Sequence, residues 1–563
     1  MVARNEQYEP LMEITIGDLF DETARRFPNT DALVYPHEGI RFTYAEMAKE
    51  TDRIAKGLLA IGIEKGSHVA IWATNVPQWV LLMIAAAKIG AVLITVNTNY
   101  KQFELEYLLR QSDADAIFLI GGFKDSDYIA HLRGLCPELT TSEPGNLQSD
   151  ALPILRNVVY LGEEGETPAG MFHWNHVVAR ADEVSDETYE SVRRSIHPHD
   201  VVNMMYTSGT TGFPKGVMLT HHNLTNNGKC IGDSMKFTED DRLCIPVPLF
   251  HCFGCVLGVM AAISHGTSMI MVETYSPVRV MKAVTAERCT AVHGVPTMFI
   301  AMLEHPDFDK YDFSTLRTGI MAGSPCPIQV MRRVVDEMNM RDITIVFGQT
   351  ESSPGMTQSR TDDPLELRVT TVGRLLPHCE GRIVDPETGI ECPPNVPGEI
   401  LTRGYHVMKG YYKMPEATQN AIDKDGWLHT GDIGMVDENG YYKITGRLKD
   451  MIIRGGENIY PREIEEFLYT HPQVSDVQVV GVPDEKYGEE VLAYVVLQKG
   501  ATVTEEEMVD FVKEGMSRHK APRYVRFIDA FPMTASGKIQ KFKLREMAVE
   551  DLNLRAAASI ETA

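Results

Sequence analysis

Short runs of apolar and β-branched residues alternate with longer stretches of helical periodicity as far as about residue 440. Examples of the apolar runs are DALVY, HVAIWA, AVLITVN, DAIFLI, SMIMVE, ITIVF and GEILTRG. Helices between buried strands are typical of α/β layers in which the sheets are largely parallel. The pattern therefore predicts an α/β fold class, with a large N-terminal domain of layered mixed and parallel sheets covered by helices.

Smaller units follow the segment GRLKD, residues 446–450. Thr504 and Glu507 form a capping-box pattern, in which each side chain can bond the backbone N–H of the other at the start of a helix. Strands are expected at VQVVGV and VLAYVVLQ. This part of the chain is long enough for an independent α+β domain. We expect one domain over residues 1–446 and a small α+β domain over residues 447–563.

The longest apolar run spans residues 79–96 but contains Lys88 and Gly90. It predicts a buried helix that leads into a buried strand, and no transmembrane segment is expected. The polar segment over residues 136–198, with its Ser, Glu and Pro clusters, is interpreted as a surface excursion. The chain starts without an apolar signal core, so secretion is not expected.

The amino-acid composition indicates which partners the chain can bind and in which compartment it is found. The 563 residues include 54 Lys and Arg against 78 Asp and Glu, a formal net charge of −24. Such a chain repels nucleic acid at long range, so nucleic acid is not an expected partner. Nine scattered cysteines indicate reduced thiols and a cytoplasmic location. Cys252 and Cys255 form a CxxC without further ligands at zinc spacing, and we interpret them as apolar wall residues.

The segment YTSGTTGFPKG, residues 206–216, has a composition suited to phosphate. Its glycines let backbone N–H groups approach an anion closely, its hydroxyls add donors, and Lys215 adds a charge. The Walker spacing is absent, and the alternative interpretation is a flexible Gly/Thr hairpin. The candidate phosphate-binding residues are Thr207, Ser208, Gly209, Thr210, Thr211, Gly212 and Lys215.

The string YTSGTTGFPKGVMLTHHNL resembles the phosphate loop of adenylate-forming enzymes, which include acyl-CoA synthetases, luciferases and peptide-synthetase adenylation domains. The resemblance covers nearly the whole chain. It extends to the strings RLKDMIIRGGENIYP and SGKIQKFKLRE of a medium-chain acyl-CoA synthetase type. It implies ATP, Mg²⁺ and coenzyme A as cofactors or co-substrates and a fatty acid as substrate. Medium chain length is also only what the resemblance implies.

The resemblance assigns nucleotide roles to residues beyond the loop. Thr350 would contact the α-phosphate and Glu351 would hold Mg²⁺, at a strand end where α/β folds place ligands. The family usually has Tyr where this chain has Phe347, so that hydroxyl is absent here. The remaining nucleotide-site candidates are Gly348 and Gln349 beside Thr350, Gly323 and Ser324 on the adenine side, and Asp432 and Arg447 at the ribose.

A second set of roles concerns catalysis and domain movement. Lys538 resembles the catalytic lysine of adenylation, carried by a mobile C-terminal domain. Lys449 falls at the family's hinge position, and Gly455 and Gly456 would flank the pantetheine arm of coenzyme A. His251 would lie beside the reacting carboxylate as a gate or orienting group. ATP and the acid would bind in the large domain.

The implied reaction has two steps. The carboxylate and ATP give acyl-AMP and pyrophosphate, and the acyl group then passes to coenzyme A. An aryl-CoA ligase and an acyl-AMP ligase that loads a carrier protein remain alternatives, because the sequence does not trace the acyl pocket. A non-catalytic nucleotide-binding protein is a third alternative. The sequence also leaves a homodimer open.

Overall fold

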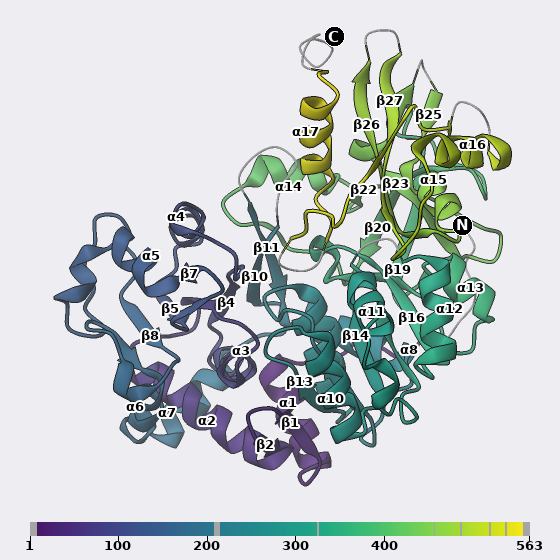
Figure 1. The fold of residues 1–563 in the computed structure, drawn as a ribbon. Helices are drawn as coiled ribbons and strands as arrows, with labels where there is room; N and C mark the ends of the chain where they lie inside the picture. Colours follow the sequence, from purple (N-terminus) through teal and green to yellow (C-terminus); the bar gives the residue numbers. More distant parts are fainter. Residues whose placement is uncertain are drawn as a thin grey trace.

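A nine-stranded sheet forms one half of the large N-terminal part (Figure 1). The computed structural model describes residues 8–207, 214–323, 326–454, 457–484, 487–516, 520–534 and 538–554. The central strands pair in parallel, and β2, β17 and β18 join antiparallel at the two edges. In sheet order the strands are β18 (Arg374–Leu375), β17 (Gly355–Gln358), β16 (Asp342–Gly348), β15 (Thr318–Met321), β14 (Ala291–Gly294), β12 (Arg242–Ile245), β13 (Ser268–Met271), β1 (Asp31–Tyr35) and β2 (Ile40–Thr43).

An eight-stranded sheet forms the other half. It is parallel from β10 to β9, and the antiparallel strands β11 and β21 extend it at one edge. In sheet order the strands are β21 (Gly410–Tyr411), β11 (Lys215–Thr220), β10 (Val201–Thr207), β4 (Val92–Thr95), β3 (His68–Trp72), β5 (Ala116–Leu119), β8 (Asn157–Tyr160) and β9 (Phe172–His173).

The polar segment over residues 136–198 is more ordered than the sequence suggested. It contains the buried strand β8 and the short strand β9, so its interpretation as a surface excursion alone was wrong. Strand β8 is only four residues long, and Arg156 and Asn157 interrupt the apolar residues in the string PILRNVVYL, residues 153–161.

Helices cover both large sheets and fill the space between them (Figure 1). The predicted helix and strand over residues 79–96 are confirmed as α3 (Pro77–Ile89) and β4. Lys88 on α3 is buried, and its ammonium lies 2.7 Å from Asp21 and 2.6 Å from Asp52. Two carboxylates thus stabilise a charge that would otherwise be costly to bury. The other helices are α1 (Ile16–Arg26), α2 (Tyr44–Ala60), α4 (Gln102–Gln111), α5 (Tyr128–Leu135), α6 (Trp174–Ala179), α7 (Asp186–Arg194), α8 (His221–Ser234), α9 (Ala261–Ile263), α10 (Pro277–Glu287), α11 (Pro296–Leu303), α12 (Ile328–Glu337), α13 (Leu365–Thr370) and α14 (Pro415–Ala421).

A four-stranded antiparallel sheet connects the large part to the C-terminal part. Its strands are β19 (Cys379–Val384), β20 (Gly398–Gly404), β22 (Leu428–Val436) and β23 (Tyr442–Arg447). A 3-10 turn, Leu448–Asp450, then leads into the C-terminal sheet. The predicted domain boundary at residues 446–450 lies at this turn and stays a prediction.

The C-terminal part has its own sheet and its own apolar cores. Strands β26 and β27 confirm the two predicted there, and the capping box at Thr504 and Glu507 is present at the start of α16. The mixed α/β architecture confirms the predicted fold class. The elements are β24 (Ile452–Arg454), β25 (Glu457–Ile459), α15 (Pro461–Leu468), β26 (Val474–Asp484), β27 (Gly488–Leu497), α16 (Glu505–Gly515), β28 (Tyr524–Phe527) and α17 (Lys541–Asp551).

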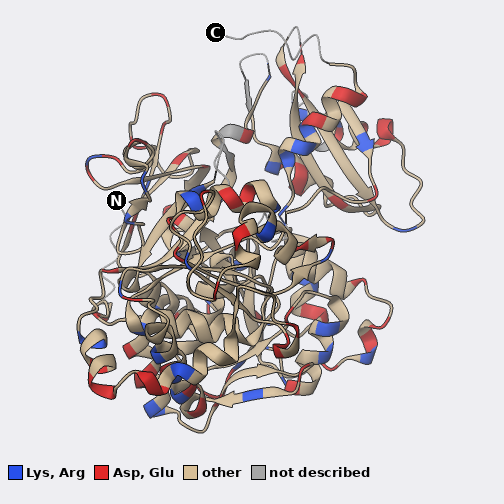
Figure 2. Cartoon of the chain, turned by 90° about the vertical axis from the view of Figure 1, so that its left-hand side faces the viewer, with Lys and Arg blue, Asp and Glu red and all other residues tan. Residues whose placement is uncertain are grey.

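Figure 2 shows acidic and basic segments interspersed along the ribbon in both parts of the molecule. Across the described portion of the chain, none of the helices combines the length and the apolar character that crossing a bilayer requires.

Candidate active site

A cavity of about 1070 Å³ lies between the large part and a loop of the C-terminal part. Its size is that of a pocket for a drug-sized or larger ligand. It brings together residues that lie far apart in the sequence and that the sequence had singled out. The predicted residues that line it are Thr207, Lys215, His251, Gly323, Gly348, Gln349, Thr350, Glu351, Asp432 and Lys538.

The hairpin of β10 and β11 enters the cavity with Thr207 opposite Lys215. The strands thus aim a hydroxyl and an ammonium from the two ends of the predicted phosphate loop. The loop residues between them fall outside the described residues, and with them the predicted ligands Ser208, Gly209, Thr210, Thr211 and Gly212.

Tyr411 links Lys215 to Glu351. The Lys215 ammonium lies 4.9 Å from the centroid of the Tyr411 ring, a cation–π distance. The Tyr411 hydroxyl donates a 2.8 Å hydrogen bond to Glu351 Oε1, and the Thr207 hydroxyl lies 3.5 Å from the same oxygen. Burial and the Glu351 charge raise the pKa of Tyr411, so the phenol keeps its proton and acts as the donor. This arrangement fixes the carboxylate at the cavity wall.

Tyr411 was not among the residues predicted from the sequence. The residue lies on β21, which pairs with β11 and places Tyr411 opposite Val217. Because that pairing joins distant segments, no local pattern in the string KGYYK could have shown it. The carboxylate of Glu399 and the ring of His429 also line the cavity, 3.0 Å apart, and were not singled out. His429 lies within the string WLHTGD, which could have suggested it.

Thr350 and Glu351 follow the end of strand β16. Gly348 has φ +157°, and a Cβ there would lie 1.8 Å from the Pro354 carbonyl oxygen, so only glycine fits this turn. A 3-10 turn then starts at Thr350, which is buried. Phe347 does not line the cavity and packs, half-buried, against the core beside the nine-stranded sheet.

His251 presents a neutral ring to the cavity. Its Nδ1 accepts the N–H of Phe253 at 3.1 Å, so the ring proton of the neutral form sits on Nε2. Burial, and then the positive charge of Lys538, lower the pKa of His251 to about 3. The ring therefore stays uncharged at neutral pH and can donate a hydrogen bond but not act as a cation.

Of the two cysteines that follow His251, Cys252 lines the cavity and Cys255 is buried in the apolar core. Cys252 and Cys255 are both buried and free, and burial raises the pKa of each thiol. The Cys252 sulfur lies 3.7 Å from the Thr350 hydroxyl. A buried protonated thiol is a small apolar group, in accord with the interpretation of the CxxC.

Lys538 reaches the cavity from a closed turn of the C-terminal part. The Thr534 N–H donates to the Lys538 carbonyl at 2.7 Å, and the Lys538 N–H donates to Thr534 Oγ1 at 3.0 Å. A Cβ added to Gly323 would lie 3.2 Å from Val295 and 3.8 Å from Lys538 Cε. The lysine stem thus passes close to the Gly323 backbone. Ser324, next to it, lies outside the described residues.

Asp432 lies on β22, lines the cavity and is buried, with 4% of its surface exposed. Its partner in the strand register is Arg447 on β23. The side chains of Arg447 and Lys449 are not among the parts that the structure describes, and Gly455 and Gly456 are not described at all.

Comparisons with known proteins place this site in a family. The profile described as AMP-binding enzyme matches residues 20–412, and the AMP-binding enzyme C-terminal domain matches residues 463–538. YngI of Bacillus subtilis strain 168, an acyl-CoA synthetase by name, is 55% identical over 547 residues, which cover 97% of this chain and 99% of YngI. The mitochondrial medium-chain acyl-CoA ligase ACSF2 of Mus musculus is 43% identical over 549 residues, with 97% of this chain and 89% of the relative covered.

The comparison with solved structures leads to the same family. ATP-bound MatB from Rhodopseudomonas palustris superposes with a TM-score of 0.81 at 29% identity, covering 95% of this chain and 99% of that chain. The chain belongs to the AMP-binding enzyme family, and the resemblance to adenylate-forming enzymes is confirmed.

Proposed function

We propose that the chain is an ATP-dependent fatty acyl-CoA synthetase that acts on medium-chain acids. One observation carries the proposal: a lysine from the C-terminal part, Lys538, shares a single cavity with Lys215, Glu351 and Asp432 of the large part. Two ammonium groups and two carboxylates around one cavity suit a nucleotide with its triphosphate at one end and its ribose at the other.

In the first step the chain would hold the carboxylate of the acid against the α-phosphorus of ATP. A carboxylate oxygen forms a bond to that phosphorus, the bond to the bridging oxygen of pyrophosphate breaks, and the electron pair leaves with pyrophosphate. Lys215 and Lys538 would offset the charge that grows on the departing group, while Thr350 donates to the α-phosphate. Asp432 would accept hydrogen bonds from the ribose hydroxyls.

The donor set at Glu351 fits Mg²⁺. The ion prefers carboxylate and phosphate oxygens, and the Glu351 carboxylate is already fixed by Tyr411 at the cavity wall. Bound there, Mg²⁺ would supply positive charge beside the phosphates. His251, neutral and with a proton on Nε2, would donate to an oxygen of the acid or of the acyl-adenylate.

In the second step the thiolate of coenzyme A attacks the carbonyl carbon of acyl-AMP, and AMP leaves with the electron pair of the broken bond. Lys538 occupies the cavity in this structure, so the C-terminal part would have to turn to admit the thiol. Lys449 would serve as the hinge, with Gly455 and Gly456 along the pantetheine arm.

We place the enzyme in the cytoplasm, because no disulfide joins any of its nine cysteines, all of which lie within the described residues. The medium-chain preference rests on the name of the ACSF2 relative, and an aromatic acid or a carrier-protein acceptor are the alternatives. Both are outcomes of one experiment.

That experiment measures pyrophosphate release and thioester formation for straight-chain acids of increasing length and for benzoate. Each added CH₂ is worth about 0.8 kcal/mol of burial, or roughly a fourfold change, so we expect a graded optimum at medium length. Benzoate as the best acid, or transfer to a carrier protein but not to coenzyme A, would contradict the proposal.

A further inference from the structure

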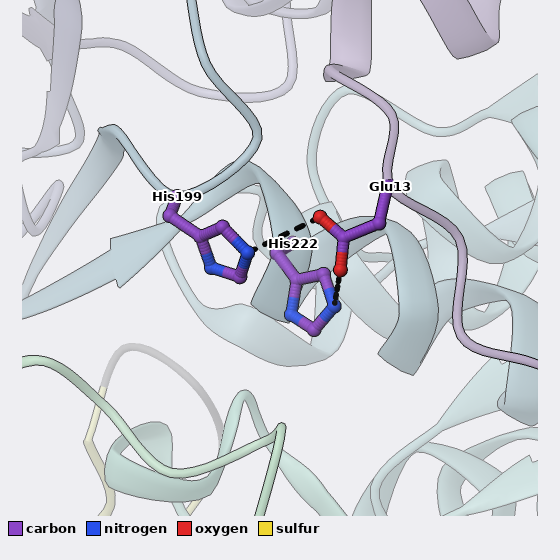
Figure 3. A group of neighbouring side chains, drawn as sticks. All are labelled: Glu13, His199 and His222. Carbon is purple, nitrogen blue, oxygen red and sulfur yellow. Dashed lines mark hydrogen bonds and ion pairs between the residues drawn. The ribbon is translucent and has the colours of Figure 1, made fainter.

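A cluster of two histidines and one glutamate lies on the large part, outside the active-site cavity. Glu13 comes from the segment before α1, His199 from the turn before β10, and His222 from the first turn of α8. Figure 3 shows the Glu13 carboxylate facing both imidazole rings. Its Oε2 lies 3.1 Å from His199 Nε2, and its Oε1 lies 3.3 Å from His222 Nε2.

The cluster has the spacing of a metal site. Zinc–nitrogen and zinc–oxygen bonds of about 2.0–2.1 Å place the ligands of a tetrahedral ion roughly 3.3 Å apart. The two measured separations are close to this value, and all three donor atoms lie within 4.8 Å of one another. The His199 side chain is 54% exposed, so a small turn of its ring can bring the two Nε2 atoms closer.

The environment of the His222 ring is a second, independent observation that indicates a bound ion. Its side chain is only 9% exposed, and its Nε2 has no hydrogen-bond partner among the described residues despite the nearby Glu13 oxygen. The Glu13 oxygen lies within ion-pair distance, marked by a dashed line in Figure 3, but outside hydrogen-bond geometry. A buried ring nitrogen without a hydrogen bond is costly unless another group binds it.

The backbone holds the three segments together without an ion. Met12 exchanges two hydrogen bonds with the Asn226 side chain, at 2.7 Å and 3.0 Å, on one side of Glu13. The Ile16 N–H donates to His221 Nδ1 at 3.1 Å on the other side. The His222 N–H donates to the carbonyl of Pro198, next to His199, at 2.7 Å. These bonds fix the positions of the three segments that carry the ligands, while the exposed side chains of Glu13 and His199 can still adjust.

We propose that Glu13, His199 and His222 form a binding site for a zinc-like divalent transition metal. Two imidazoles and one carboxylate are the donors that Zn²⁺ accepts, and water would complete the tetrahedron. Mg²⁺ and Ca²⁺ prefer all-oxygen sites and would bind poorly. Because the N-terminus of α8 disfavours a cation, the Glu13 carboxylate is required for binding as well as for geometry.

The ion would be structural. Strand β10 begins two residues after His199 and ends at the phosphate-loop end of the hairpin, a length of roughly 20 Å, so the site cannot touch bound ATP. It would instead tie the N-terminal segment to the base of the β10–β11 hairpin. Ion binding should then raise the Tm of the chain, since the ion binds only the folded form tightly.

The test titrates the metal-free full-length protein with Zn²⁺, without nucleotide, and measures bound metal by equilibrium dialysis. The variants are Glu13→Gln and His199→Ala, because both side chains are exposed and their loss should not unfold the protein. His176→Ala is the matched control: His176 is also exposed and lies 2.9 Å from a glutamate, Glu164, but within the described parts of the chain this pair belongs to no three-residue ligand group.

We expect one Zn²⁺ per chain in the wild type and in His176→Ala, with a higher Tm, and no comparable site for Mg²⁺. In Glu13→Gln and His199→Ala the affinity should fall by at least about 100-fold, since loss of even a supporting group costs 10–100-fold. Co²⁺ should give tetrahedral visible bands in the wild type and not in His199→Ala. The absence of binding to the wild type, or equal affinity in all four proteins, would overturn the site.

Discussion

The hydrogen bond from Tyr411 to Glu351 offers a sharp test of how the cavity works. Tyr411→Phe removes one oxygen atom and keeps the ring that lies 4.9 Å from the Lys215 ammonium. It leaves Glu351 without the 2.8 Å hydrogen bond that fixes its carboxylate. In the proposed mechanism that carboxylate binds the metal beside the phosphates. Loss of the hydrogen bond should therefore slow the first half-reaction, the formation of acyl-AMP.

The expected fall in kcat/KM follows from the strength of a hydrogen bond to a charged group. A hydrogen bond to a charged group contributes about 1.5–3 kcal/mol, and each 1.36 kcal/mol of transition-state stabilisation is a factor of ten. Loss of the Tyr411 hydroxyl should therefore lower kcat/KM for ATP by about 10–100-fold, measured as pyrophosphate release. Thioester formation from supplied acyl-AMP should change little, because that step does not involve the leaving pyrophosphate.

Tyr412→Phe is a closely matched control. The Tyr412 hydroxyl also donates a 2.8 Å hydrogen bond to a carboxylate, that of Asp113, but neither residue lines the cavity. The control should keep its pyrophosphate release within about twofold, with any loss confined to stability. Equal effects of the two substitutions on kcat/KM, or an equal loss of both half-reactions in Tyr411→Phe, would refute the role of this bond.

Three further outcomes follow. Lys215→Gln should slow pyrophosphate release by about 10²–10³-fold in single-turnover assays and leave the reaction of supplied acyl-AMP nearly unchanged. Gly323→Ala should also slow pyrophosphate release, because the φ of Gly323 is +89° and the new Cβ would lie 3.2 Å from Val295. Equal rates of pyrophosphate release in the variant and the wild type would contradict this close packing. Burial lowers the pKa of His293 to about 4, whereas a histidine in the unfolded chain has a pKa near 6.5. As the pH falls, the unfolded chain is therefore protonated before the folded chain, which favours unfolding. The free energy of unfolding should thus drop by about 2 kcal/mol by pH 5 from this group alone, and urea unfolding of His293→Gln should show a shallower pH dependence.

Each apolar run named from the sequence coincides with a strand, because strands of a sheet covered on both faces read as continuous apolar runs. The buried strands β12, β14 and β15 were not predicted. The apolar pattern also predicted the helix–strand pair over residues 79–96 despite Lys88, whose two carboxylate partners only the fold reveals. The order of the strands could not be predicted, since β12 lies between β13 and β14 through pairings between segments that are distant in sequence. Strand β8 was missed because Arg156 and Asn157 separate its three apolar residues from the apolar residues before it, which leaves a run too short to signal a strand.

The cavity residues were found where their strings resemble a family and missed where the fold alone assembles them. Thr207, Glu351 and Lys538 stand in recognisable strings, and all three line the cavity. Tyr411 was missed because its role depends on the pairing of β21 with β11. The cluster around Glu13 was missed for the same reason, because its ligands come from three separate segments.

The central claim is that Lys538 serves adenylation and leaves the site for thioester formation. The direct test measures both half-reactions of Lys538→Ala: acyl-AMP formation from acid and ATP, and acyl-CoA formation from supplied acyl-AMP and coenzyme A. The account predicts that the first falls by at least about 10²–10³-fold while the second stays close to the wild-type rate. Equal loss of both rates, or acyl-AMP formation at the wild-type rate, would contradict it.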